Sequence, residues 1–494
     1  MKDRSAYVEP QNLSKAPIII VMVMGAFVAI LNQTLLNVAL PSLMKDLDIS
    51  VTSAQWMTTI FMLVNGILIP ISAFFMEKFT TRKLFLVAMG LFTLGTLLCG
   101  IAPTFVILLV GRVVQAAGAG IMMPLLLNVV LSLFPVAKRG GAMGLIGLPM
   151  MFAPAIGPTL SGWIVQDHSW RVLFFIVLPI ALLDLILAYF FLRNVTETTN
   201  PKVDVTSIIL STFAFGGLLY GFGVAGDDGW TDPIVLTTLG IGAVAMIIFV
   251  TRQMRIKTPM LEFRVFKYPM FSLTTVINLV VTMAMFSAML LIPIYVQNVL
   301  GWSPLKSGLL LLPGALISAF MSPVTGMLFD KIGARPLALI GLGLTAITTY
   351  FFTDLSMDTS FRFMLLLYAA RMIGISMIMM PIMTAGLNQL PKRLYSHGTA
   401  MANTLRQMAG AIGTAFLVTI MSSQAAKSAK DMAADLTAPP TKEVMLNIQN
   451  LSTIDGINHA FMVATVFAVI GFILSFFIKK TVPMEDEEPT NDVI

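Results

Sequence analysis

Residues 171–192 read RVLFFIVLPIALLDLILAYFFL, and this stretch decides the fold class. It is apolar except for Arg171 at its start and Asp184 near its middle. A helix of about twenty apolar residues crosses the roughly 30 Å hydrocarbon core of a bilayer. Lipid offers the backbone no hydrogen bonds, so only helices and closed barrels span it, and a continuous apolar run lacks the alternation of a barrel strand. The stretch therefore predicts a membrane-spanning helix.

Similar runs recur along the whole chain of 494 residues, which is 57% hydrophobic and only 11% charged. A water-soluble domain of this length needs more charge to cover its surface. The sequence therefore predicts an all-α integral membrane protein with fourteen spans. We expect them near residues 17–40, 53–76, 84–102, 105–132, 141–165, 171–192, 205–225, 232–252, 271–296, 305–329, 336–354, 360–388, 396–422 and 458–478.

The distribution of basic residues predicts the orientation of the chain in the membrane. With both termini cytoplasmic, 21 Lys and Arg fall in cytoplasmic segments and 7 in extracellular ones. This asymmetry follows the positive-inside rule and indicates a multi-pass protein of the plasma membrane. Because the bases lie in short loops between spans, the net charge of +6 does not indicate nucleic-acid binding. Residues 423–457 are predicted to be a long, solvated extracellular loop, and 485–488 part of an acidic cytoplasmic tail.

An internal repeat divides the chain into two related halves. The tract 73–83 (AFFMEKFTTRK) ends the second span, and 326–336 (GMLFDKIGARP) ends the tenth; each carries an acid, then bases, in a very short turn. A weaker pair begins at Arg112 and Arg371, and each ends in Ile-Met-Met-Pro. The repeat predicts a six-helix bundle at 1–193, two inserted spans with a linker at 194–270, and a second six-helix bundle at 271–494.

Several tracts in this order resemble the major facilitator superfamily, and in particular its fourteen-span drug:proton antiporters of the EmrB/QacA type. They are 31–41 (LNQTLLNVALP), the loop tract 326–336, 112–120 (RVVQAAGAG), 153–162 (APAIGPTLSG) and Trp170-Arg171. The tract 73–83 departs from the loop signature at Ala73, Glu77, Thr80 and Thr81. The resemblance covers nearly the whole chain. It implies the major facilitator fold and proton-coupled export of amphipathic compounds by alternating access.

The loop tracts and two of the spans supply candidates for gating, movement and coupling. Asp330 can accept backbone N–H groups at a helix start, and Gly333 permits a tight turn. Two prolines one turn apart bend the fifth span, and neighbouring glycines let another helix approach. The gating candidates are Glu77, Lys78, Arg82, Asp330, Lys331, Gly333 and Arg335, and the hinge candidates are Pro154, Gly157, Pro158 and Gly162. Topological anchoring and plain helix packing are the alternative readings.

Proton coupling needs a titratable group in the membrane, and the chain departs from the resemblance on this point. Asn32 stands where the antiporters carry an Asp, and an amide cannot carry a proton through a transport cycle. Asp184 is the one acid deep in a predicted span, and an apolar environment favours its protonated form. Arg112, which the resemblance ties to coupling, and Gln115, three residues on, complete the candidate set. A helix-packing hydrogen bond is the alternative role for Asp184.

A substrate pocket is expected near the midplane between the halves. The candidates are Asn32, Gln33 and Asn37 on the first span, Gln55, Trp56 and Asn65 on the second, and Met285, Phe286 and Gln297 on the ninth. The 36 methionines and 34 phenylalanines offer adaptable apolar walls for varied ligands. We expect an amphipathic small molecule and protons as cargo, a lipid bilayer as surroundings, no nucleic acid and, from the resemblance, a monomer.

Three readings of function remain. The main one is a proton-coupled multidrug efflux antiporter, with no cofactor or metal. The second keeps the fold but exports a single anionic, zwitterionic or lipid-like metabolite, which Asn32 and the scarcity of membrane acids favour. The third is a non-transporting receptor or scaffold, which would not need the gate-like tracts. An enzyme is not expected, because phosphate loops, nucleotide fingerprints, metal-spaced His/Cys sets and nucleophile elbows are missing from the sequence.

Overall fold

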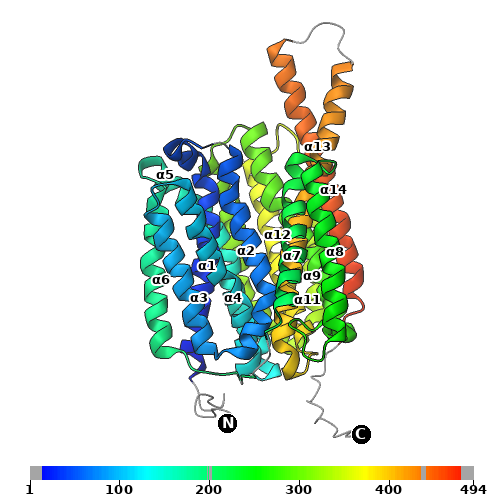
Figure 1. Cartoon of the computed structure of the whole chain (residues 1–494). Helices are drawn as coiled ribbons and strands as arrows, with labels where there is room; N and C mark the ends of the chain where they lie inside the picture. Colours follow the sequence, from blue (N-terminus) through cyan, green and yellow to red (C-terminus); the bar gives the residue numbers. More distant parts are fainter. Residues whose placement is uncertain (1–13, 50, 197, 200–202, 435–440, 480–494) are drawn as a thin grey trace.

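Long helices stand side by side in a single bundle (Figure 1). The computed structural model describes residues 14–49, 51–196, 198–199, 203–434 and 441–479. Within these ranges, fourteen helices are long and apolar enough to cross a membrane. They are α1 (Lys15–Leu47), α2 (Val51–Lys78), α3 (Thr81–Gly100), α4 (Phe105–Leu133), α5 (Arg139–Asp167), α6 (Arg171–Phe191), α7 (Val205–Asp228), α8 (Pro233–Arg255), α9 (Pro269–Ile294), α10 (Pro304–Ile332), α11 (Ala334–Phe351), α12 (Phe361–Leu387), α13 (Tyr395–Ala434) and α14 (Lys442–Ser475). The predicted fold class is confirmed.

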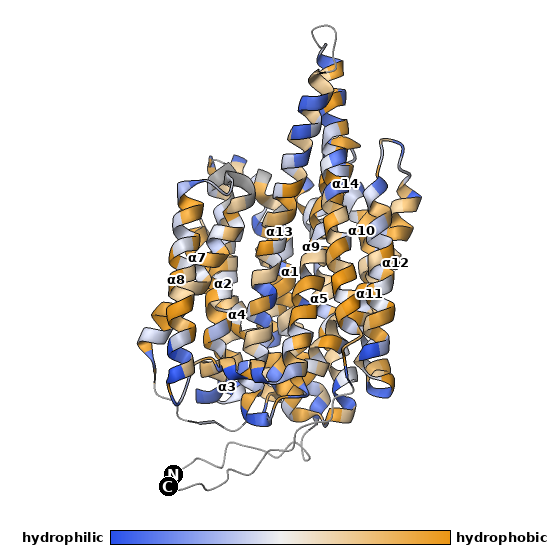
Figure 2. Cartoon of the chain, turned by 90° about the vertical axis from the view of Figure 1, so that its right-hand side faces the viewer, coloured by the Kyte–Doolittle hydropathy of each residue, from blue (hydrophilic) through white to orange (hydrophobic). Residues whose placement is uncertain are grey.

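The outer surface of the bundle is apolar, as a surface in contact with lipid must be. Large side chains point outward with half or more of their area exposed, among them Phe190 at 65%, Ile247 at 68% and Phe320 at 69%. A soluble protein rarely exposes so much contiguous apolar surface. Hydrophobic residues accordingly dominate the middle of the helices in Figure 2, and polar ones gather at their ends. The protein is a multi-pass membrane protein.

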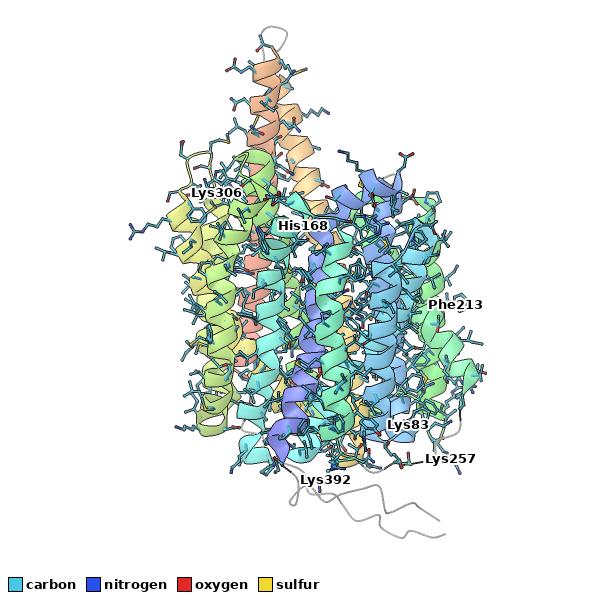
Figure 3. All side chains as sticks on the ribbon, turned by 90° about the vertical axis from the view of Figure 1, so that its left-hand side faces the viewer. Lys83, His168, Phe213, Lys257, Lys306 and Lys392 are labelled. Atoms are coloured by element: carbon cyan, nitrogen blue, oxygen red, sulfur yellow. The ribbon has the colours of Figure 1, made fainter. Side chains whose placement is uncertain are left out.

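The two ends of the bundle differ in charge. We call the end at which α1 begins and α14 ends the terminal face; it lies at the bottom of Figure 1. In Figure 3, Lys83, Lys257 and Lys392 lie at the terminal face, whereas His168 and Lys306 lie at the opposite face. The basic residues that the sequence assigned to cytoplasmic turns therefore gather at one end of the helices.

The helices group as the internal repeat suggests. The most extensive contact in the bundle joins α5 to α10, and so links the first six helices to the last six. Helices α7 and α8 pack against each other, and α7 also packs on α2 and α13. The stacked rings of Trp56 on α2 and Tyr220 on α7, 5.7 Å apart, fix one side of this attachment. The pair therefore lies at the edge of the junction between the two groups.

Helices α13 and α14 extend well beyond the bundle as a hairpin (Figures 1 and 2). The predicted solvated loop at 423–457 is therefore wrong for most of its length: 423–434 belong to α13 and 442–457 to α14. The tract QAAKSAKDMAA at 424–434 is polar but rich in good helix formers, so it continues the helix into water. The amide of Gln424 donates to Asp455 at 2.9 Å and ties the two helices together. The predicted acidic tail lies outside the described residues.

A cluster at the opposite face joins three parts of the first six helices. The Asp46 carboxylate, just after the membrane-spanning part of α1, accepts from Arg171 Nη1 at 2.6 Å and from Trp170 Nε1 at 3.0 Å. Arg171 also donates to the Ala102 carbonyl between α3 and α4. The hydrogen bond from Arg171, supported by that from Trp170, holds the pKa of Asp46 below its usual value.

This cluster gives a stability term that depends on pH. The pKa of Asp46 is lower in the folded protein than in the unfolded chain, where it is about 4. Asp46 therefore contributes fully to the free energy of unfolding above about pH 4, and this contribution is lost as the pH falls through the folded pKa. We expect Asp46→Asn to lower the Tm of the detergent-solubilised protein at pH 7, and the gap to wild type to narrow as the pH is lowered below about 4. The exposed Asp358→Asn serves as the control. A gap that stays constant between pH 7 and pH 3 would contradict this account.

Candidate functional site: buried arginines and a terminal-face gate

Arg112 is fully buried at 0% exposure, about 10 Å from the start of α4 at the opposite face. Its Nη1 donates to Asn32 Oδ1 at 2.9 Å and to Gln115 Oε1 at 2.7 Å, and its Nε donates to the Met57 carbonyl at 3.2 Å. The Phe61 ring lies 4.1 Å from the guanidinium carbon. These groups bring α1, α2 and α4 together around one cation.

Close packing of α3 against α4 fixes this arrangement. A Cβ at Gly95 would lie 2.4 Å from the backbone nitrogen of Gln115, so only glycine permits the approach. Gln115 in turn donates to Thr96 Oγ1 at 2.7 Å. The sequence placed Gln115 on the face of Arg112, and the structure brings the two together with Asn32.

The acceptors around Arg112 are neutral. Asn32 supplies an amide oxygen where the antiporters have a carboxylate, so the charge of the buried guanidinium is hydrogen-bonded without being neutralised. Burying a cation without a counter-charge at this depth costs several kcal/mol of desolvation free energy. The cost is smaller when hydrogen-bond acceptors occupy its donors. Asn32 is therefore a structural partner of Arg112 as well as a predicted substrate contact.

The second half also contains a buried arginine that is hydrogen-bonded to neutral acceptors on neighbouring helices. Arg371 on α12 is 1% exposed and donates to the Ala284 carbonyl of α9 at 2.6 Å and to Thr349 Oγ1 of α11 at 3.0 Å. Arg112 likewise reaches the first helix of its half, and Thr96 of α3 joins its network through Gln115. The internal repeat thus extends from sequence to side-chain contacts.

Asp184 stands apart from both arginines. It is 0% exposed in the middle of α6, and neither carboxylate oxygen has a hydrogen-bond partner among the described residues. It faces Gly25 on α1 and Phe85 on α3: a Cβ at Gly25 would lie 2.7 Å from Asp184 Oδ2. Arg112 has its own set of acceptors, so the structure does not bring these two coupling candidates together as an ion pair.

Three polar contacts cross between the halves at the terminal face. Asp330 at the end of α10 accepts from the backbone N–H groups of Gly140 (2.8 Å) and Gly141 (2.9 Å) at the start of α5. A negative charge at a helix N-terminus interacts favourably with the helix dipole. The helices nearly touch here, since a Cβ at Gly140 would lie 2.4 Å from the Gly326 carbonyl. Asp330 therefore has the latch geometry that the sequence suggested.

Arg139 makes the second contact. Its side chain is 4% exposed and donates to Asn388 Oδ1 at 2.9 Å and to Tyr395 Oη at 2.9 Å, at the end of α12 and the start of α13. It also donates to the carbonyls of Leu131 and Phe134 in its own half. Sequence reasoning counted Arg139 only as a cytoplasmic base and missed this role. Its place directly before Gly140-Gly141 is the one local signal.

Glu77 and His397 make the third contact. Glu77 Oε1 at the end of α2 lies 2.9 Å from His397 Nε2 on α13, with the two side chains 23% and 8% exposed. Ser396 donates to the same oxygen at 3.4 Å. The sequence proposed Glu77 for the gate, whereas His397 belongs to none of the predicted sites. The structure pairs the two across the halves.

The remaining gate candidates are placed less centrally. Arg82 contacts the Tyr189 ring and carbonyl within its own half, and Lys78 lies 5.3 Å from the Phe74 ring. Lys331 and Arg335 are exposed at the terminal face. Gly333 has φ of 82°, a left-handed conformation that the turn between α10 and α11 requires.

Gly157, one of the predicted hinge residues of α5, faces α1 of the first half. A Cβ at Gly157 would lie 2.2 Å from Thr34 Oγ1, and Thr34 donates to the Ala153 carbonyl at 3.3 Å. The tract thus packs α5 on α1, whereas Gly144 packs on Ser322 of α10, across the halves. Pro154 and Gly162 lie within helical α5, and the side chain of Pro158 is outside the described residues.

The predicted substrate residues are scattered. Trp56 faces α7, Asn65 faces Gly120 on α4, and Phe286 packs on Gly410 of α13. Met285 packs in the apolar core of the second half. Gln33 is half-buried on α1, and Gln297 is half-buried in a π-helical turn after α9; the side chains of Asn37 and Gln55 are outside the described residues.

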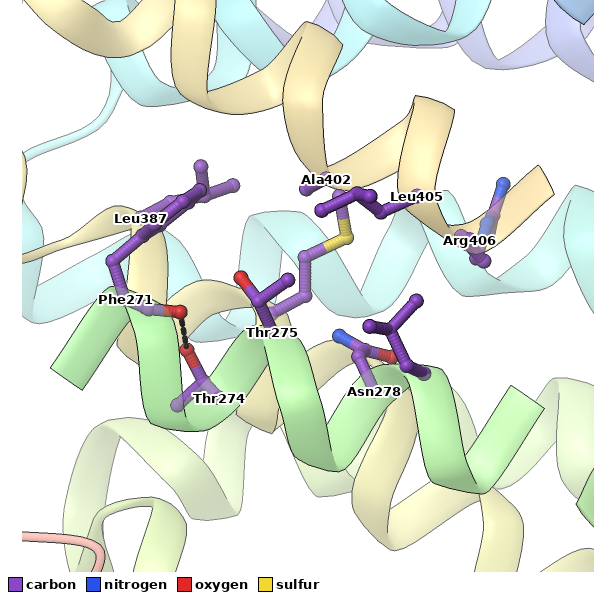
Figure 4. Close-up of a pocket in the computed structure, with 11 residues that line it drawn as sticks. Phe271, Thr274, Thr275, Asn278, Leu387, Ala402, Leu405 and Arg406 are labelled. Atoms are coloured by element: carbon purple, nitrogen blue, oxygen red, sulfur yellow. Dashed lines mark hydrogen bonds between the residues drawn. The ribbon is translucent and has the colours of Figure 1, made fainter. Parts of the chain in front are cut away.

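A small cavity of about 10 Å³ lies between α9, α12 and α13 (Figure 4). Thr274, Thr275 and Asn278 line one side of it, and Leu405 and Arg406 line the other. This volume holds about one water molecule. The close-up shows Arg406 on α13 at the edge of the cavity, with its side chain turned away from Leu387 and Phe271.

Comparison with known proteins decides the family. The Major Facilitator Superfamily profile matches residues 22–414. The chain belongs to the Major Facilitator Superfamily. Members of this superfamily that it resembles include the MFS-type transporter YhcA of Bacillus subtilis, 49% identical over 94% of this chain and 92% of the relative. The lincomycin resistance protein LmrB of the same species is 45% identical over 95% and 97%.

A more distant relative and a solved structure extend the comparison. The multidrug export protein EmrB of Haemophilus influenzae is 29% identical over 81% of this chain and 78% of the relative. The fold matches that of the human organic anion transporter MFSD10 with a TM-score of 0.66 at 11% identity, covering 94% of this chain and 99% of that one. The expected fold and family are confirmed, and the protein is a transporter rather than an enzyme.

The hydrogen bond between Asn32 and Arg112 gives a test of the buried network. Asn32→Leu keeps a similar volume but removes the acceptor, and we expect a loss of about 1–3 kcal/mol of stability from the unpaired donor. Asn32→Asp restores an acceptor and a counter-charge, and should be at least as stable as wild type. Thermal unfolding in detergent measures both variants. An Asn32→Leu variant as stable as wild type would show that the contact is dispensable.

Proposed function

We propose that this protein exports amphipathic compounds across the cell membrane by proton-coupled alternating access. The latch between Asp330 and the start of α5 carries the proposal, because it joins the two six-helix halves at one face by bonds that water can replace. The names of LmrB and EmrB support efflux of antibiotics or other drugs. In this proposal the exporter works as a monomer.

The moving units follow the internal repeat. Residues 1–193 and 271–494 rotate relative to each other as two units. The helices at 194–270 lie at the edge of the junction between these units. The gathering of lysines at the terminal face supports a cytoplasmic location for that face and for both termini. With Asp330, Arg139 and Glu77 engaged, the described conformation is closed toward the cytoplasm.

Asp184 is the proposed proton carrier. Among the described residues it is the fully buried carboxylate of the membrane spans, and it has no hydrogen-bond partner to hold its charge. A carboxyl group in such surroundings exchanges a proton only when movement of the helices admits water. Gly25 opposite Asp184 and Asn32 beside Arg112 are separated by about 10 Å along α1, so this helix can link proton uptake to the Arg112–Gln115 network.

A dedicated exporter of an anionic metabolite is the second candidate. It is favoured by the three arginines at membrane depth, Arg112, Arg371 and Arg406, whose hydrogen-bond acceptors are neutral groups. Both candidates share the gate and the proton site, and they differ in the charge of the cargo.

The proton site is tested in proteoliposomes loaded with a pH-sensitive dye. With an acidic external medium and inward flow of protons, added substrates should produce proton movement in the wild type. We expect Asp184→Asn to abolish proton movement and gradient-driven transport while folding normally. Asp358→Asn, an exposed acid between α11 and α12, should behave as wild type. Full coupled transport by Asp184→Asn would refute the assignment of Asp184.

The gate is tested by cysteine accessibility in a Cys99→Ala background. Met383 is 7% exposed behind the terminal-face contacts, so Met383→Cys reports on their opening. Asp330→Asn and Arg139→Gln each weaken a charge-assisted hydrogen bond of the gate, so the gate should open more often. The cysteine at position 383 should then be labelled about tenfold faster or more in inside-out vesicles. Lys257→Gln, at the same face but away from the gate, is the control. Equal labelling in every variant would show that these contacts do not hold the face closed.

A further inference from the structure

The three arginines at membrane depth differ in how far their donors are used. Arg112 donates three hydrogen bonds to neutral acceptors, and Arg371 donates to the Ala284 carbonyl, Thr349 and Ser287. Both are fully buried within one half. Each therefore serves its own six-helix bundle, and neither faces the junction where cargo must pass.

Arg406 occupies a different position. It lies on α13 eleven residues from Tyr395, roughly 16 Å from the terminal face, which is close to the middle of the membrane. Its Nη1 lies 3.5 Å from Met150 Sδ on α5, which belongs to the other half and is also eleven residues from its helix start. Asn278 and Thr275 of α9 lie across the small cavity from α13 (Figure 4). Arg406 thus lies at membrane depth and contacts the other half through Met150.

The donors of Arg406 are poorly used. An arginine has five N–H groups, and a thioether sulfur is a weak acceptor. Besides Met150, the only acceptor that Arg406 meets among the described residues is Asn403 Oδ1, at 3.2 Å. No carboxylate forms an ion pair with it in the described chain, and the buried carboxylate of Asp184 lies on α6, which packs on α1 and α3. Arg406 is half-buried, so its remaining donors are open to a ligand or to water, and at membrane depth a guanidinium is stabilised when they are occupied.

We propose that Arg406 binds an oxyanion, a carboxylate or phosphate group, carried by an amphipathic substrate. The planar guanidinium fork matches two oxygens of such a group. The polar side chains of Asn278 and Thr275 lie at the same level on α9, and Met150, Met383 and Leu405 supply an adaptable apolar wall for the rest of the molecule. The cavity itself lies among helices of the second half and holds only about one water. The head group therefore binds beside it, between Arg406 and Met150 of the other half, where space opens when the halves separate. This inference rests on the proposed export function and names its substrate class.

A matched series of ligands tests the inference. Tritiated decanoate, decyl phosphate, decanamide and decylamine share one apolar chain and differ in head group. Their binding to the purified full-length protein is measured by scintillation proximity, below their micelle concentrations. We expect decanoate, decyl phosphate or both to bind at least tenfold more tightly than the amide and the amine. Equal or tighter binding of the amide or amine, or no binding of either anion, would overturn the proposal.

Variants separate recognition from folding. Arg406→Gln should remove the preference for the anion while keeping the Tm within a few degrees, and Arg406→Lys should retain part of it, since a lysine keeps the charge without the fork. Arg362→Gln, an exposed arginine at the opposite end of α12, should bind like wild type. An anion preference that survives in Arg406→Gln would place the site elsewhere and refute the proposal.

Transport of the same series distinguishes this inference from the proposed function. Uptake of decylamine but not of the anions into inside-out vesicles would sink the oxyanion site and leave export standing. Binding of an anion that depends on Arg406, without transport of any compound, would support the site and contradict export.

Discussion

Guanidinium groups without carboxylate partners govern how the helices are arranged. Arg112 draws acceptors from α1, α2 and α4, and Arg371 draws them from α9 and α11. In hydrocarbon, an N–H group on a cation that lacks an acceptor costs far more than in water, so these acceptors cannot be given up singly. Helices of each six-helix half are therefore joined around their own arginine, an arrangement that favours movement of the half as one unit.

The contacts between the halves obey a different rule. Arg139, Asp330 and Glu77 lie at the terminal face, within reach of water once the helices part. Water can replace each lost partner at little net cost, so these bonds can hold the face closed and still release it. Deeper along α5, Gly144 packs directly on Ser322 of α10, whose hydroxyl donates to the Gly144 carbonyl at 2.9 Å. Strong bonds within halves and replaceable bonds between them are what rigid-body rocking requires.

Hydropathy alone located eleven of the fourteen helices to within about three residues at each end, the exceptions being α1, α13 and α14, because the length of an apolar run and the thickness of a bilayer are matched. The same reasoning failed at 423–457, since polarity reports on contact with water and says nothing of helix propensity, which is high in 424–434. Asp330 was found because its loop tract is repeated. Arg139 and His397 were not, because their partners are about 250 to 320 residues away and only packing shows them. The sequence likewise could not show which residues surround Asp184, although its position near the middle of the sixth span was predicted correctly.

The separation of Asp184 from Arg406 bears on how coupling can work. On the proposed assignments, the empty and deprotonated protein carries an unpaired carboxylate on α6 and an incompletely bonded guanidinium on α13. A proton removes the first charge, and an anionic head group neutralises the second. Each event lowers the desolvation cost of closing apolar helices around that site. The proton and the substrate can then act in alternate steps of the exchange cycle, because each lowers the cost of the movement from its own site.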